Sequence, residues 1–212
     1  MSQGERNLQE MHGTKRRADA FYNNQMIDYL NTEMQEFVKA RQFLFMSTSD
    51  AGGNCDSTFK AGEPGFVYII DNKRLMYPEY RGNGVMASLG NITENPHIGL
   101  LFIDFFEDQI GLHVNGAAEI IENDELHTII PDKNTRTALF AQHENRTELW
   151  VVTTVHEAYI HCSKHIPKLV DTKNLTDWGT DDTKNLTDWG TDDTKKKGGD
   201  YFKVKQSKKE RE

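Results

Sequence analysis

The segment from Tyr77 to Ile92 contains the residues of this sequence that are best suited to bind a phosphate group. Arg81 stands beside two glycines, Gly82 and Gly84, where a strand is expected to lead into a helix. Glycine lets the backbone approach a ligand closely, the first turn of a helix offers unpaired N–H groups, and arginine donates charge-assisted hydrogen bonds to phosphate oxygens. A tight turn without a ligand has the same composition, so the flanking elements have to decide between the two interpretations.

The flanking residues favour the phosphate-binding interpretation. Residues 75–77 predict a short strand before the turn. Four apolar side chains after it have the spacing of one helical face: Val85, Met86, Leu89 and Ile92. Asn95-Pro96 predicts the end of this helix, because the residue before proline avoids the helical region, and residues 97–105 predict a further strand. The glycine-rich turn is therefore expected between a strand and a helix.

The remaining pattern predicts mostly antiparallel β-structure. Residues 18–42 predict one helix with an apolar stripe. Further strands are expected at residues 43–48, 57–60, 67–70, 110–120 and 149–155, with a short helix around residues 163–169. Asn115-Gly116 is a typical hairpin pair, yet the apolar alternation continues through it, which predicts one long strand with a bulge at the glycine.

These motifs together resemble those of one known family. They follow one another in this order: residues 45–50 (FMSTSD), 56–62 (DSTFKAG), 64–67 (PGFV), 82–83 (GN), 88–92 (SLGNI), 95–96 (NP), 99–102 (GLLF), 113–116 (HVNG) and 158–164 (AYIHCSK). The sequence resembles, over about residues 40–168, the FMN-binding split-barrel proteins related to pyridoxamine 5′-phosphate oxidase. The resemblance implies a mainly β (α+β) fold, an antiparallel six-stranded split β-barrel with flanking helices. It also implies a homodimer with one FMN in each of two clefts at the subunit interface.

Eight residues are the expected cofactor contacts: Lys60, Tyr77, Arg81, Gly82, Asn83, Ser88, Trp150 and Lys164. Arg81 offers a planar fork of donors and Lys60 a point charge from the neighbouring strand, although a solvated surface position is the alternative for both. Core packing is the alternative for Trp150. Two positions depart from the family pattern, because Val85 and Ala117 stand where many relatives have basic residues.

The resemblance implies an FMN-dependent oxidoreductase that acts on a small molecule, since the flavin itself carries the redox chemistry. The sequence identifies no catalytic acid or base, and His113 and His156, on expected strands, have packing as their alternative. Val85 and Ala117 favour a second hypothesis, a non-catalytic protein that binds or senses flavin, haem or a deazaflavin. A third hypothesis is that the C-terminal tail recruits a protein partner.

Composition and repeats predict one domain with two polar ends. With 212 residues of which 36% are hydrophobic, the chain can build one core of ordinary size, and we place it at residues 18–170. Residues 1–17 are expected to be a flexible segment. In the tail, residues 171–181 recur identically as residues 182–192, so we expect residues 171–212 to be disordered or laid on the surface. Trp178 and Trp189 in the repeats could instead anchor a partner.

Charge and cysteine content exclude several classes of protein. A formal net charge of -8 argues against nucleic acid as the principal partner. No apolar run approaches membrane-spanning length and no signal peptide is recognisable, which predicts a cytoplasmic protein without a membrane partner. The two cysteines are too few for a disulfide framework. A cluster of possible metal ligands is formed by His161, Cys162 and His165. It lacks a fourth ligand of suitable spacing, so no metal is expected.

Overall fold

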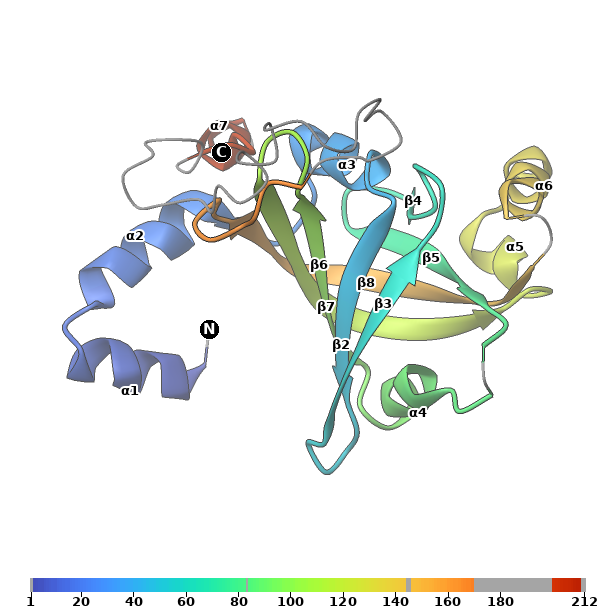
Figure 1. Ribbon diagram of the computed structural model, residues 1–212, viewed down its shortest axis with the longest axis horizontal. Helices are drawn as coiled ribbons and strands as arrows, with labels where there is room; N and C mark the ends of the chain where they lie inside the picture. The colour runs from blue at the N-terminus through green and yellow to red at the C-terminus, as the bar shows by residue number, and fades with distance from the viewer. Residues whose placement is uncertain (1, 83, 144–145, 170–199, 211–212) are drawn as a thin grey trace, which may run out of the picture.

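The computed structural model describes residues 2–82, 84–143, 146–169 and 200–210. Its centre is an antiparallel sheet of eight strands in the order β3-β2-β6-β7-β8-β5-β4, with β1 paired to β8 (Figure 1). Six strands are long: β2 Phe43–Ser49, β3 Cys55–Ala61, β5 Arg74–Tyr80, β6 His97–Asp104, β7 Ile110–Glu122 and β8 Thr147–His161. Two are short: β1 Met26–Ile27 and β4 Tyr68–Ile69. The expected mainly β, antiparallel fold with flanking helices is confirmed.

The expected bulge in the longest part of the sheet is also confirmed. β7 is one continuous strand, and its register against β8 shifts between Asn115 and Gly116. A Cβ atom at Gly116 would lie 1.9 Å from the carbonyl oxygen of Thr154 on β8. Only glycine allows this close approach of two backbones, which explains why a hairpin-type pair stands inside a strand.

The helices differ more from the expectation. Their bounds are α1 Gln3–Met11, α2 Lys15–Gln25, α3 Thr32–Lys39, α4 Ala87–Glu94, α5 Leu126–Ile129, α6 Lys133–Gln142 and α7 Val204–Lys209. The single helix predicted at residues 18–42 is wrong, because β1 interrupts this range and pairs with β8. A separate helix, α3, begins after Asn31, which caps it by accepting a hydrogen bond from Met34 N–H at 3.0 Å. No helix in the described part of the chain is long and apolar enough to cross a membrane.

Both ends of the chain are more ordered than the sequence predicts. α1 occupies most of residues 1–17, where we expected a flexible segment. The helix predicted around residues 163–169 does not form; that segment is a turn, and Leu169 N–H donates to the carbonyl of Phe105. The repeats at residues 171–192 lie outside the described residues. Residues 200–210 are not a disordered tail, because Phe202 and Val204 are buried in the main core.

The curl of the sheet creates the geometry of the site. β3 and β5 are separated in the sheet by β2, β6, β7 and β8, yet Lys60 on β3 and Glu79 on β5 form an ion pair. α4 follows β5 after a loop and lies at the lower end of the sheet in Figure 1, with α3 and α7 at the opposite end. Leu89 and Ile92 fix α4 to the core. The sheet therefore brings β3, the end of β5 and the start of α4 together.

Candidate functional site

A cleft of about 630 Å³ opens where β3, the end of β5, the start of β8 and the start of α4 meet. Its volume is in the range of small-molecule sites. It is lined by Asp56, Thr58, Lys60, Glu79, Tyr80, Arg81, Gly82, Gly84, Val85, Met86, Ala87, Ser88, Leu89, Glu148 and Leu149. Four of the residues expected to contact a cofactor, Lys60, Arg81, Gly82 and Ser88, therefore share one cavity.

The loop between β5 and α4 forms one wall of the cleft. Gly84 has a φ of 82°, which favours glycine, whereas a Cβ at Gly82 would meet no described atom within 4 Å. Met86 precedes α4 with a φ of 53° and its side chain does not cap the helix. The first-turn N–H groups of α4 thus begin beside the cleft without a side-chain cap from Met86. Asn83 lies outside the described residues.

One expectation for this loop is wrong. Val85 and Met86 are 70% and 54% exposed, so they do not share the buried helical face of Leu89 and Ile92. The reason is that α4 begins only at Ala87, after the left-handed residue Met86. Both apolar side chains line the cleft instead, where they can contact a flat apolar ligand.

Lys60 is already engaged by a carboxylate. Its Nζ lies 2.6 Å from both Oε1 and Oε2 of Glu79, and the two side chains are only 18% and 19% exposed. The contact joins edge strand β3 to the end of β5. Sequence reasoning placed the lysine at the site but missed its partner, which stands in the same segment as Tyr77 and Arg81.

Ser88 and the cleft charges complete the polar lining. The buried Ser88, in the first turn of α4, donates a hydrogen bond from Oγ to Asp56 Oδ2 at 2.6 Å. Among the described lining residues the cations are Lys60 and Arg81, whereas the carboxylates are Asp56, Glu79 and Glu148. The cleft therefore has one more negative than positive charge. Strand alternation would have predicted Asp56 and Thr58, because they lie on the same face of β3 as Lys60.

Tyr80 connects the cleft to a buried histidine. Its Oη lies 2.8 Å from Nδ1 of His143, which is 2% exposed. Burial, and then the charge of Arg146, lower the pKa of His143, so that imidazole is neutral at pH 7. Sequence reasoning missed both residues, and no local motif marks them.

Three of the expected cofactor contacts do not line the cleft. Trp150 is completely buried and packs edge-on against His143, with a ring-centroid distance of 5.5 Å, and its indole N–H donates to Asn123. Tyr77 is also completely buried, its hydroxyl donates to the sulfur of Met46, and burial raises the pKa of its phenol. Both are core aromatics. Lys164 is exposed on the turn after β8, away from the residues that line the cleft of its own chain.

The positions that depart from the family pattern lie in different places. Val85 is in the cleft, whereas Ala117 lies on β7 opposite His97 of β6 and Thr154 of β8. The absence of a basic side chain at position 85 thus affects the cleft directly. Arg81, exposed on the same loop, is the cation closest to it in the sequence.

Comparisons with known proteins identify the family. The family model described as "Pyridoxamine 5'-phosphate oxidase" matches residues 30–162, more than half of the chain. No curated protein sequence matches. Among solved structures, HupZ from Group A Streptococcus is 20% identical, with a TM-score of 0.45 over 61% of this chain and 92% of that chain.

Two further solved structures show the same level of similarity. A putative pyridoxamine 5′-phosphate oxidase from Lactobacillus delbrueckii is 20% identical, with a TM-score of 0.43 over 63% of this chain and 99% of that one. HutZ from Vibrio cholerae, described as a haem storage protein, is 14% identical, with a TM-score of 0.39 over 62% and 93%. These identities are too low to transfer a ligand or an activity.

Proposed function

We propose, because the chain belongs to the pyridoxamine 5′-phosphate oxidase family, that it binds FMN in the cleft and acts as an FMN-dependent oxidoreductase on a small molecule. One observation carries the proposal: Arg81, Lys60 and the start of α4 line the same cavity. They are a guanidinium, an ammonium and a set of helix N-terminal N–H groups, which are the donors that a phosphate monoester requires.

The donor set fits the cofactor in kind. Arg81 would take two phosphate oxygens with its planar guanidinium, and the first turn of α4 would donate backbone N–H groups. Lys60 and the Ser88 hydroxyl would add further donors once they leave their carboxylate partners. Val85, Met86 and Leu149 supply apolar surface that would cover a flat ring and exclude water from it. The flavin, when bound, supplies the electron transfer itself.

Tyr80 is the lining residue best placed to influence proton transfer. Its hydroxyl is held by the neutral imidazole of His143, and the Arg146 guanidinium lies 5.4 Å from the centre of its ring. These contacts fix the phenol at the cleft wall. Because one hydrogen bond joins the phenol to the imidazole, a proton can pass between Tyr80 Oη and His143 Nδ1.

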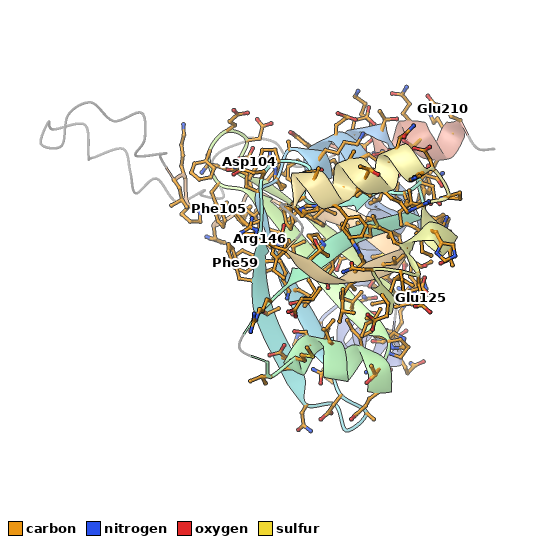
Figure 2. All side chains as sticks on the ribbon, turned by 90° about the vertical axis from the view of Figure 1, so that its right-hand side faces the viewer. Phe59, Asp104, Phe105, Glu125, Arg146 and Glu210 are labelled. Carbon is orange, nitrogen blue, oxygen red and sulfur yellow. The ribbon has the colours of Figure 1, made fainter. Side chains whose placement is uncertain are left out.

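We propose a homodimer that uses one aromatic face, defined by Phe43 and Phe45 on β2, Phe59 on β3 and Phe105 directly after β6. Phe45 and Phe59 are 41% and 54% exposed, and Phe43 stacks on Phe59 and on Phe105 with centroid distances of 5.6 and 5.9 Å. In Figure 2, Phe59 and Phe105 lie near each other along one side of the molecule. Phe43 and Phe105 are half-buried beneath the two exposed rings, and an aromatic cluster that reaches the surface in this way is typical of an interface.

The test of the proposed function uses the purified full-length chain. Added FMN should give a bound-flavin spectrum, and NADH or NADPH should bleach it under anaerobic conditions, with dithionite as the chemical control. A chain that binds no FMN would refute the proposal. Binding with bleaching by dithionite alone would support the second candidate, a non-catalytic flavin-binding protein, which the excess of carboxylates in the cleft favours.

The dimer is tested separately. Sedimentation equilibrium should give twice the chain mass of 24.3 kDa, and Phe59→Glu should shift it to the monomer because it places a charge in the aromatic face. Met11→Glu, at a side chain that is 75% exposed on α1, is the matched control and should leave the mass unchanged. A monomeric wild-type chain would contradict the dimer.

A further inference from the structure

Glu79 forms an ion pair with the Lys60 ammonium, which a phosphate in this cleft would use. The two carboxylate oxygens of Glu79 each lie 2.6 Å from Lys60 Nζ, so Glu79 is the ion-pair partner of this lysine. A carboxylate and a phosphate compete for the same donors because both are oxygen anions. On the proposed function, therefore, a phosphate-bearing flavin has to displace Glu79 or bind with Arg81 and α4 alone.

The other carboxylates of the cleft have different partners. Asp56 accepts a hydrogen bond from Ser88 Oγ, and Glu148 is an exposed side chain at the start of β8. Among the described lining residues, only Glu79 forms an ion pair with a cation of the cleft. A phosphate monoester has about 1.5 to 2 negative charges at pH 7, so it is repelled strongly by a carboxylate held at its own binding site.

The position of Glu79 allows it to move. It is the second-last residue of β5, and the register of β5 against β8 shifts directly after it, between Glu79 and Tyr80. Its side chain is 19% exposed and faces the cleft. Rotation of the side chain toward solvent would release Lys60 without breaking the strand pairing that precedes it.

We propose that Glu79 is a specificity-determining residue that lowers the affinity of the cleft for phosphate. It holds Lys60 when no ligand is bound and gives it up only to a phosphate-bearing flavin. This inference rests on the proposed function. Its consequence is that the cleft gains little from the phosphate: FMN binds reversibly, with an affinity close to that of riboflavin, which has the same ring and no phosphate.

The experiment compares the dissociation constants of FMN and riboflavin, measured by quenching of flavin fluorescence. Glu79→Gln removes the charge and keeps the shape, so it should tighten FMN at least tenfold, about 1.4 kcal/mol, and change riboflavin less than twofold. Glu148→Gln removes an equal charge from the same cleft without releasing Lys60, and its effect on FMN should stay below threefold. The double variant Lys60→Gln/Glu79→Gln should not show the tighter FMN binding of Glu79→Gln. This result would assign the gain in affinity to the Lys60–Glu79 pair.

The outcomes separate the two proposals. If wild-type protein binds FMN and Glu79→Gln leaves the ratio of FMN to riboflavin affinity unchanged, the role of Glu79 is refuted while the FMN site stands. If neither wild-type protein nor any variant binds either flavin, the proposed function fails and the role of Glu79 fails with it. Should Glu79→Gln not fold, Glu79→Asp keeps the charge but shortens its reach toward Lys60, and it should tighten FMN about threefold. An unchanged affinity in that variant refutes the role equally.

Discussion

Replacing Phe202 with alanine should destabilise the whole domain, although this residue lies beyond the repeats near the C-terminus. Phe202 is 1% exposed and packs edge-on against Phe37 of α3, with ring centroids 5.2 Å apart. Removing a fully buried phenylalanine ring costs about 3 to 5 kcal/mol. Because domains of this size have a free energy of unfolding of about 5 to 15 kcal/mol, the loss is a large fraction of the total.

Urea unfolding followed by far-UV circular dichroism measures this loss. Asn31 Nδ2 donates a hydrogen bond to the main-chain carbonyl of Phe202, and this contact does not depend on the phenylalanine ring. The loss of stability in Phe202→Ala therefore measures the packing of the ring alone. Met11→Ala, at an exposed side chain of α1, is the control and should change the free energy of unfolding by less than about 0.5 kcal/mol. A loss below about 1 kcal/mol for Phe202→Ala would refute the conclusion that residues 200–210 belong to the core.

Two further predictions concern the sheet. Gly116→Ala should lower the free energy of unfolding by more than about 3 kcal/mol, because the new Cβ would lie 1.9 Å from the carbonyl oxygen of Thr154. The control is Gly90→Ala in α4, whose Cβ meets no atom within 4 Å and which should stabilise the protein by about 0.5 to 1 kcal/mol. Thermal melts of both variants check this, and equal stability of the two variants would contradict the bulge geometry. Burial, and then the charge of His161, lower the pKa of His113 to about 4. The unfolded chain therefore binds more protons than the folded one between pH 6.5 and 4, so stability falls as the pH falls through this window. The full shift corresponds to about 3.4 kcal/mol, and partial solvation of the ring reduces our expectation to about 2 kcal/mol. His113→Asn should flatten the pH dependence of the free energy of unfolding, and an unchanged slope would contradict the assignment to His113.

The strands were predictable because their alternation is a local property of the sequence. β7 shows this best, since its period of two passes through Asn115-Gly116 and outweighs the hairpin signal. β1 has two residues and no period of its own, so the helix predicted across it could not be divided correctly from the pattern. The buried position of Phe202 depends on contact with Phe37, far away in the sequence, and no local pattern reports such a contact.

The site was predictable only in part. The motif around Arg81 and the position of Lys60 follow from the sequence, whereas the partner of Lys60 depends on the curl that brings β3 to β5. The polar tips of Tyr77 and Trp150 made them plausible ligand contacts. In the structure these tips find partners inside the core, in Met46 and Asn123. Aromatic residue type alone does not indicate which of these two environments applies.

The measurement that tests the central claim most directly is a crystal structure of the full chain soaked or co-crystallised with FMN. We expect one FMN per chain in the cleft, with its phosphate on the guanidinium of Arg81 and the first turn of α4, and with the carboxylate of Glu79 turned away from Lys60. Flavin density at another place on the chain, or none at an FMN concentration that saturates binding in solution, would contradict the assignment of the cleft as the cofactor site.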